Sequence, residues 1–215
     1  MIDLHTHTLF SDGVLIPAEL ARRAEVAGYR AIAFTDHADH SNIEQILHGI
    51  VNGCKALNER GSLRAIPGVE ITHVHPDDFA VLVRRARKSG AQIIVAHGET
   101  LVEPVRAGTN RAAIEAGVDI LAHPGLITEE EVKKAGERGV LLEITTRKGH
   151  SLSNGHVASL AVKFGVPLVC NTDSHAPGDL VTKEMARRIL QGAGLHGAEV
   201  KKVFEHSERF INELS

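Results

Sequence analysis

One pattern recurs along this chain and constrains its fold: a glycine that would end a helix is followed by a short apolar run, and that run ends in polar residues. The runs are RAIAFTDH after Gly28, SLRAIPGVE after Gly61, AQIIVAH after Gly90, VDILAH after Gly117, VLLEITTR after Gly139 and VPLVCNTDSH after Gly165. Glycine is the usual residue just past a helix, and runs rich in Val, Ile, Leu and Ala are typical of strands buried on both faces. Together with the opening MIDLHTH, the pattern predicts seven parallel strands that alternate with helices.

The segments between these runs have helical patterns. Pro17 and Pro76 stand where a first helical turn would begin. ELARRAEVAG and EEEVKKAGERG have mixed apolar and charged faces, and residues 197–214 form an amphipathic pattern whose apolar stripe is Val200, Val203, Phe204 and Ile211. The sequence therefore predicts a helix after each strand and a further helix at the C-terminus.

The distribution of polar residues at the strand ends distinguishes between two architectures, an open sheet and a barrel. An open doubly wound sheet would concentrate functional residues at one switch point, whereas polar residues here end almost every strand. That distribution favours a barrel, whose site is ringed by all the loops at the carboxyl ends of the strands. We expect an α/β fold, a distorted seven-stranded (β/α)7 TIM-like barrel with a C-terminal helix, and one domain over residues 1–215, because no linker or low-complexity tract interrupts the pattern.

Composition excludes several classes of protein. With 43% hydrophobic and 24% charged residues, the chain is neither disordered nor a disulfide scaffold. No apolar run approaches the roughly 18 residues of a membrane helix, and residues 1–5 do not resemble a signal peptide. Two cysteines, Cys54 and Cys170, favour free thiols in a reducing compartment, so we expect a cytoplasmic protein with no membrane partner. A net charge of −3 and 3% aromatic residues count against a nucleic-acid partner.

The chain has 14 histidines, and the strand-end residues point to metal chemistry. The candidate ligands at or just beyond the strand ends are His5, His7, Asp12, His37, Glu70, His97, His123, Asp173 and His175. Imidazoles and carboxylates without thiolates suit Zn²⁺, Mn²⁺ or Fe²⁺. Because a single catalytic zinc uses about three protein ligands, nine candidates nearly suffice for three divalent ions if one carboxylate bridges.

The alternative is that these histidines are ordinary hydrogen-bonded or surface residues, as each would be if it stood alone. Their joint placement at the strand ends favours a metal site. The ordinary interpretation applies to seven of the other eight histidines, which are His40, His48, His73, His75, His156, His196 and His206.

The motifs DLHTHTLFSDG, FTDH, GVE, AHG, AHPG and NTDSH together resemble the PHP (polymerase and histidinol phosphatase) family of metal-dependent phosphoesterases. The resemblance runs from Asp3 to about Ala176 and implies a seven-stranded barrel. It also implies three ions: one held by His5, His7, Glu70 and Asp173, a second by Glu70, His97 and His123, and a third by Asp12, His37 and His175. No ligand position is missing, which argues against a metal-free member. Asp12 stands where some relatives carry histidine, and this substitution bears on the choice of metal.

The sixth predicted strand, VLLEITTR, ends in cations instead of ligands, with Arg147, Lys148 and then His150. A guanidinium matches phosphate bidentately, and histidinol-phosphatase-like relatives have an arginine in this region. We therefore expect Arg147 to act in catalysis and substrate binding, with Lys148 as a second substrate-binding candidate. The alternative is a solvated loop pair. Either His150 or a metal-bound water would protonate the leaving oxygen.

Four functions remain open at this point. The first is hydrolysis of a phosphate monoester, histidinol phosphate or another small phosphorylated metabolite, by a hydroxide that bridges two metals. The second is a phosphodiesterase or 3′–5′ exonuclease acting on nucleotides, which the scarcity of aromatic residues disfavours. The third is an amidohydrolase, many of which carry lysine where this chain has His97. The fourth is a non-catalytic metal-stabilised module, against which the full ligand set argues.

Overall fold

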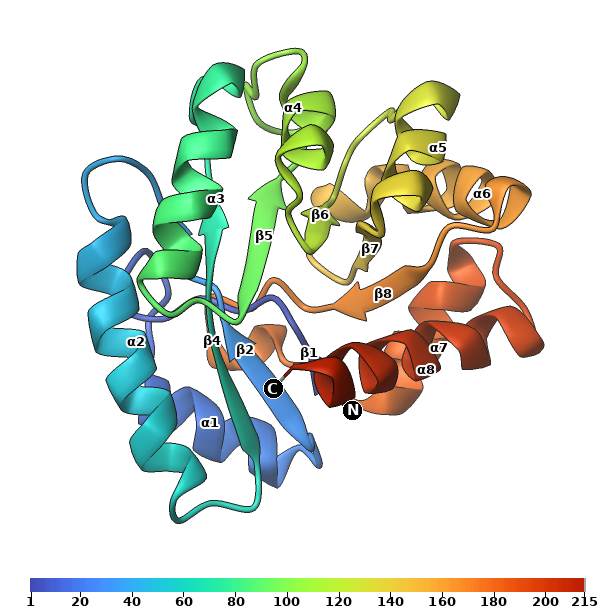
Figure 1. Ribbon diagram of the computed structural model, residues 1–215. Coiled ribbons are helices and arrows are strands. Elements are labelled where there is room, and N and C mark those ends of the chain that lie inside the picture. The colour runs from blue at the N-terminus through green and yellow to red at the C-terminus, as the bar shows by residue number, and fades with distance from the viewer. Residues whose placement is uncertain (215) are drawn as a thin grey trace.

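The computed structural model describes residues 1–214, in which parallel strands curve into a nearly closed barrel (Figure 1). The strands of the wall, in spatial order, are β1 (Ile2–Asp3), β2 (Ala31–Phe34), β4 (Arg64–Ile71), β5 (Ile93–His97), β6 (Ile120–Ala122), β7 (Leu141–Thr145) and β8 (Leu168–Asn171). A short strand, β3 (His37–Ala38), pairs with the carboxyl end of β4. The order of the wall follows the chain, so each connection joins neighbouring strands, as expected of a barrel.

The seam between β1 and β8 is closed mainly by residues beyond the two strands. Thr6 and Ser174 form a parallel bridge, the amide of Asp173 donates to the carbonyl of His5 at 2.9 Å, and the amide of His7 donates to the carbonyl of Ser174 at 2.8 Å. The first and last strand ends therefore lie side by side, and the residues at these ends face one another.

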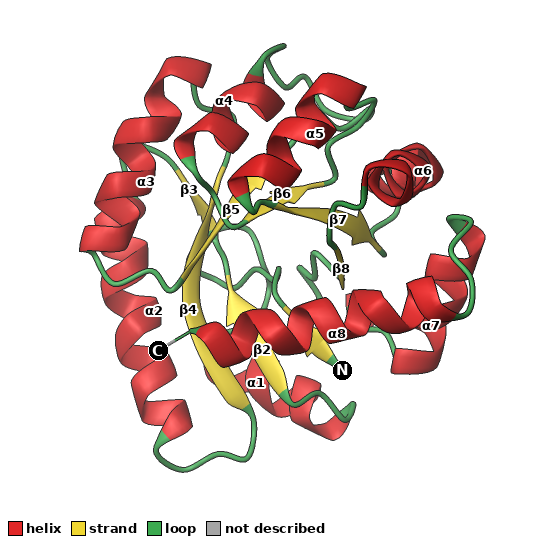
Figure 2. Cartoon of the chain, turned by 45° about the vertical axis from the view of Figure 1, so that its right-hand side comes forward, coloured by secondary structure: helices red, strands yellow, loops and turns green. Residues whose placement is uncertain are grey.

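Helices form the outer layer (Figure 2). The α-helices are α1 (Pro17–Val26), α2 (Ile43–Asn58), α3 (Phe79–Lys88), α4 (Thr109–Ala116), α5 (Glu129–Arg138), α6 (Asn154–Phe164), α7 (Lys183–Gly192) and α8 (Ala198–Glu213), and the 3₁₀ turns are η1 (Pro76–Asp78), η2 (His150–Ser153) and η3 (Pro177–Asp179). Pro17 and Pro76 begin α1 and η1, as their missing amide hydrogens favour. Gly117 and Gly139 end α4 and α5 with φ of 77° and 71°, a conformation that other residues adopt at a cost.

Two apolar layers hold the barrel together. One lies between the strands and the surrounding helices. The other fills the barrel interior with small and branched side chains such as Ala33, Ile66 and Val95. Ile211 of α8 joins this inner layer, because α8 packs against β1 and β8 and lies across the end of the barrel at which the strands begin (Figures 1 and 2).

The predicted fold, a seven-stranded barrel with a C-terminal helix, is confirmed. Val200, Val203 and Ile211 of the predicted stripe are buried, while Phe204 is half-buried. The first strand is shorter than the run MIDLHTH suggests, because the hydrogen-bonded part of β1 ends at Asp3. His5 and His7 nevertheless both turn inward, and their ring centroids lie 5.0 Å apart.

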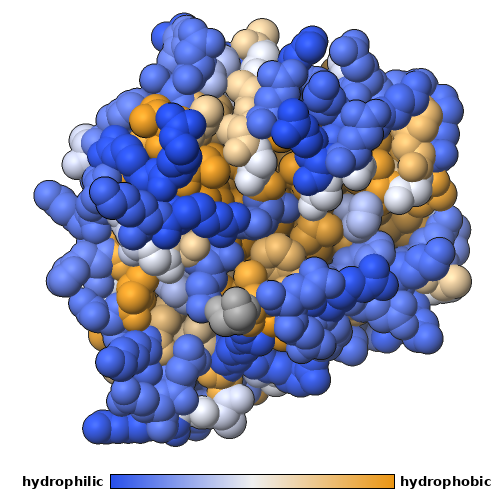
Figure 3. Space-filling model, viewed as in Figure 1, coloured by the Kyte–Doolittle hydropathy of each residue, from blue (hydrophilic) through white to orange (hydrophobic). Residues whose placement is uncertain are grey.

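Polar residues cover most of the face seen in Figure 3, and apolar atoms appear between the polar ridges. Within residues 1–214, no helix combines the length and the hydrophobicity that crossing a membrane requires.

Candidate metal centre

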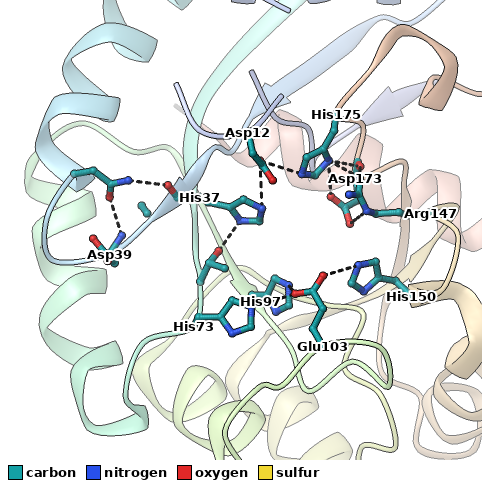
Figure 4. Close-up of a pocket in the computed structure, with 13 residues that line it drawn as sticks. Asp12, His37, Asp39, His73, His97, Glu103, Arg147, His150, Asp173 and His175 are labelled. Atoms are coloured by element: carbon teal, nitrogen blue, oxygen red, sulfur yellow. Dashed lines mark hydrogen bonds and ion pairs between the residues drawn. The ribbon is translucent and has the colours of Figure 1, made fainter. Parts of the chain in front are cut away.

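The carboxyl ends of the strands surround a pocket of about 330 Å³ (Figure 4). Its wall includes Asp12, His37, His97, Asp173 and His175 from the predicted ligands, together with Arg147 and His150. The other four predicted ligands are His5, His7, Glu70 and His123, which are all almost fully buried. The structure therefore brings all nine predicted ligands together from the ends of β1 to β8, as parallel strands in a barrel require.

Four of these residues form the deepest group. Nε2 of His5 lies 3.3 Å from Oε1 of Glu70 and 3.7 Å from Oδ1 of Asp173. Nε2 of His7 lies 3.1 Å from the same Asp173 oxygen and 3.1 Å from Nε2 of His5. These donor atoms point at one small volume, where a single ion could accept several of them.

Glu70 also belongs to a second group. Its Oε1 lies 3.6 Å from Nε2 of His123, and donor atoms of Glu70, His97 and His123 all lie within 4.8 Å of one another. One carboxylate thus faces two neighbouring clusters of imidazoles, which is the arrangement that a bridging ligand needs.

The third group lies nearer to solvent. Oδ1 of Asp12 is 3.1 Å from Nε2 of His175 and 3.5 Å from Nε2 of His37. His7 also lies within reach of this group. The Asp12 side chain is 59% exposed, so this group is the most accessible of the three.

Several buried polar atoms in these groups have no hydrogen-bond partner among residues 1–214: Oε1 of Glu70 and Nδ1 of His7, His97 and His123. A buried polar atom left unpaired costs about 1–3 kcal/mol, so a carboxylate oxygen in this condition is unusual. A divalent cation beside Glu70 would remove that cost, and oxygen and imidazole donors suit Zn²⁺, Mn²⁺ and Fe²⁺. The residues present therefore fit bound metal ions.

Burial and neighbouring charges also shift the pKa values of the proposed ligands. Burial and the neighbouring imidazoles of His37 and His5 hold the pKa of His7 well below its usual value, and burial together with His97 does the same to the pKa of His123. Burial opposes the charge on Glu70, but the imidazoles of His5 and His97 outweigh it and hold its pKa well below the usual range. His7, His123 and Glu70 thus have the protonation states that bind metal. At His5, His37 and His97, nearby carboxylates outweigh burial and raise the pKa, so these three imidazoles would lose a proton when metal binds.

The backbone of this site carries strain. Within residues 1–214, the non-glycine residues with positive φ are His73 (54°), His123 (28°) and Asp173 (51°). L-residues adopt this region at an energetic cost, and such conformations gather at functional sites. Two of the three are predicted ligands and the third lines the pocket.

The predicted substrate-binding residues differ in position. Arg147 lines the pocket, where its Nη1 donates to the carbonyl of Asp173 at 2.9 Å and lies 2.5 Å from Nδ1 of His175. Lys148 is exposed and is not part of the pocket wall. His150 is buried in the wall, with Nδ1 2.8 Å from the hydroxyl of Thr100.

Sequence reasoning missed two glutamates and the role of one histidine. Glu103, in the loop after β5, has Oε2 3.1 Å from both His97 Nε2 and His73 Nε2 and Oε1 3.3 Å from His150 Nε2. The hydrogen bond from His97 lowers the pKa of Glu103 to about 2. No periodicity marks Glu103 in the sequence, and His73 was expected to be an ordinary histidine. Glu143 is buried in β7 against His5, and its charge in an otherwise apolar run is a usable signal.

A barrel with a pocket of imidazoles and carboxylates at the carboxyl ends of its strands is typical of metal-dependent α/β-barrel hydrolases. Comparison with known proteins gives the family. Residues 3–102 match the model of the PHP domain. The chain is 46% identical to the uncharacterized protein MJ1295 of Methanocaldococcus jannaschii, covering 95% of this chain and 94% of that protein. It is 26% identical to a protein of Acetivibrio thermocellus named "Probable phosphatase", and the match covers 89% of this chain and 86% of that protein. The chain belongs to the PHP family, as its motifs indicate. The family match and the phosphatase relative support a metal-dependent phosphoesterase.

Other similarities concern nucleic-acid enzymes and the fold. The chain is 30% identical to the 5′-3′ exoribonuclease Rnm of Escherichia coli over 76% of this chain, and it spans 48% of that protein. A chain from a structure of archaeal ribonuclease P with mature tRNA superimposes with a TM-score of 0.75 at 21% identity. The superposition covers 99% of this chain and 90% of that chain. A candidate histidinol phosphatase of Listeria monocytogenes superimposes with a TM-score of 0.63 at 14% identity. That superposition covers 86% of this chain and 99% of the other. At these identities the structural matches show the barrel fold alone.

Proposed function

We propose that this protein hydrolyses the phosphate monoester of a small metabolite, such as histidinol phosphate, at a centre of three divalent metal ions. The observation that carries the proposal is the position of Glu70, whose fully buried carboxylate faces two imidazole clusters at once. In this proposal the ions are Zn²⁺, Mn²⁺ or Fe²⁺.

The proposed ligand sets follow the three groups of donor atoms. The first ion binds His5, His7, Glu70 and Asp173, the second binds Glu70, His97 and His123, and the third binds Asp12, His37 and His175. Divalent ions, when bound, supply a more acidic water and neutralise phosphoryl oxygens.

The side chains of the pocket wall supply the other parts of the reaction. Arg147 directs Nη1 at the carbonyl of Asp173 and at His175, and its Nε lies 3.5 Å from Oδ2 of Asp173. In this proposal Nη2 donates to phosphoryl oxygens. His150 is proposed to give a proton to the leaving oxygen. Thr100 Oγ1, 2.8 Å from Nδ1, orients the ring of His150. Nε2, 3.3 Å from Glu103 Oε1, is the nitrogen proposed to carry and give the proton.

The size of the pocket supports a small substrate. A volume of about 330 Å³ lies near the lower end of the range for ligand sites. We also propose that residues 1–215 act as one domain in the reducing cytoplasm, where Cys54 and Cys170 stay free and buried as the structure has them.

Phosphodiester cleavage on RNA is a second candidate function. The similarity to a 5′-3′ exoribonuclease over three-quarters of this chain favours it, and it differs in polarity from the 3′–5′ activity considered from the sequence. The low aromatic content, 3%, disfavours stacking on single-stranded bases.

Two chromogenic esters and one oligonucleotide distinguish these candidates. We expect Mn²⁺- or Zn²⁺-supplemented protein to hydrolyse p-nitrophenyl phosphate faster than bis-p-nitrophenyl phosphate, and a chelator to abolish both activities. Faster cleavage of the diester, with processive shortening of a 5′-phosphorylated oligoribonucleotide, would replace the monoesterase proposal with the second candidate. Hydrolysis that persists in excess chelator would refute the metal dependence of both.

A further inference from the structure

A carboxylate that the proposed reaction does not use is fully buried in the middle of β7. Glu143 lies beneath the metal ligands, and both of its oxygens have partners. Oε1 lies 2.9 Å from Nδ1 of His5 and 2.9 Å from Nδ2 of Asn171. Oε2 accepts a hydrogen bond from the backbone amide of His123 at 3.2 Å. One side chain thus joins β7 to residues from the ends of β1, β6 and β8.

Every partner of Glu143 is a hydrogen-bond donor. The amide of His123 can only donate. The side-chain oxygen of Asn171 accepts from the amide of Leu4 at 2.9 Å, which turns its Nδ2 group toward Glu143. The oxygen of Glu143 accepts at Nδ1 of His5, so Nδ1 carries the hydrogen, and Nε2, which faces Glu70 and Asp173, is the nitrogen available to a metal. An ionised carboxylate, which only accepts, is the group that can satisfy three donors.

These contacts act on two proposed ligands of two different ions. A hydrogen on Nδ1 of His5 leaves the lone pair of Nε2 directed at the first group of donors. The bond to the amide of His123 holds a residue whose φ is 28°, a conformation that needs support from its surroundings. The ligands proposed for the third ion, Asp12, His37 and His175, are not among the partners of Glu143.

We propose that Glu143 is a positioning residue that prepares the first and second metal sites together by fixing the tautomer of His5 and the backbone of His123. The inference rests on the proposed trinuclear centre. Glu143 touches no substrate in this proposal, and its effect passes through His5 and His123.

The substitution Glu143→Gln tests the proposal, because glutamine has nearly the same shape but carries an NH₂ donor in place of one accepting oxygen. If its amide oxygen faces His5 and Asn171, its NH₂ group faces the amide hydrogen of His123. If the amide is flipped, the NH₂ group faces Nδ1 of His5, which must then move its hydrogen to Nε2 and lose the metal-binding lone pair. Both orientations damage at least one site.

The experiment measures binding of Zn²⁺ alone, by dialysing the full chain against a series of chelator-buffered free Zn²⁺ concentrations and counting bound ions by elemental analysis. We expect three ions in the unchanged protein. In Glu143→Gln, two of the three should bind roughly ten- to a hundredfold more weakly, the usual effect of losing such a partner. The third ion should bind with its original affinity. Combining Asp12→Asn with Glu143→Gln should abolish binding of this third ion.

Asp119→Asn is the matched control. Asp119 is another largely buried carboxylate, but it braces β5 and α3 at the opposite end of the barrel through the amide of Ile94 and Nη2 of Arg87. Its substitution should lower the melting temperature without changing the affinity for any of the ions. A role of Glu143 in fold stability alone would make the two variants behave alike.

Several outcomes would overturn the inference. Unchanged Zn²⁺ affinities in Glu143→Gln would do so, as would equal weakening of all three ions. If Glu143→Gln does not fold, Glu143→Asp keeps the charge but shortens the reach, and it should fold and weaken the same two ions. Failure of both variants to fold would assign Glu143 to folding and refute the positioning role. Fewer than three ions in the unchanged protein would instead refute the proposed centre, so the two failures are distinguishable.

Discussion

The bridging role of Glu70 makes a quantitative prediction about stability. Glu70→Gln preserves the size of the side chain and removes the charge that two ions would share. Because Oε1 of Glu70 lies 3.3 Å from Nε2 of His5 and 3.6 Å from Nε2 of His123, the substitution acts directly on the first and second ions. At the third ion it changes only a contact of the ligand His37, whose Nδ1 lies 2.7 Å from Oε2 of Glu70. Asp12→Asn is the comparison, since Asp12 contacts His37 and His175 of the third group only.

The magnitude follows from linkage between binding and folding. An ion present at 100 times its Kd stabilises the folded state by about 2.7 kcal/mol, so losing two ions removes about 5 kcal/mol and losing one removes about 3 kcal/mol. For a chain of this size, about 2–4 °C of melting temperature corresponds to each kcal/mol. The metal-dependent rise in Tm should therefore fall by about 10–20 °C in Glu70→Gln and by about 5–10 °C in Asp12→Asn.

The assay is thermal unfolding followed by circular dichroism, with each variant measured in saturating Zn²⁺ and in chelator. Comparing the two conditions within one variant cancels any effect of the substitution on the metal-free protein, where Glu70 also contacts His37 at 2.7 Å. Phosphatase activity should fall further in Glu70→Gln than in Asp12→Asn. Equal losses of metal-dependent stabilisation in the two variants would refute the bridging role.

The remaining predictions concern metal content, substrate binding and the thiols. Elemental analysis of metal-supplemented protein should approach three divalent ions per chain, because the four overlapping donor groups among the nine proposed ligands divide into three proposed ligand sets. Full activity with one ion would contradict this. Arg147→Ala should lower kcat/KM roughly ten- to a hundredfold, since a charge-assisted contact contributes about 1.5–3 kcal/mol. Lys148→Ala, at an exposed position outside the pocket wall, is the control, and equal losses would argue against a specific role for Arg147. Cys54 and Cys170 should resist a chromogenic thiol reagent in the folded protein and react fully in guanidinium, because both are buried and burial raises the pKa of Cys54 to about 12; rapid reaction of either native thiol would contradict the burial.

The sequence by itself determined the barrel and the nine candidate ligands. Glycines such as Gly117 and Gly139 mark helix ends through a local backbone preference. Apolar runs such as IIVAH mark buried strands through their composition. Parallel strands of a barrel have their carboxyl ends on one face, so a residue's position at a strand end places it at the site without further knowledge. For the same reason, the family resemblance could assign ligands by motif alone.

Only the tertiary structure decided which groups face one another across the barrel. Glu143 meets His5 from 138 residues away, and Glu103 reaches three imidazoles because of the path of the loop after β5. Arg147 contacts Asp173 and His175, whereas Lys148 beside it is exposed and does not line the pocket. The physical reason is that strand and helix patterns arise from neighbours in the chain, whereas these contacts depend on how the seam between β1 and β8 closes and on loop conformations that no periodicity records.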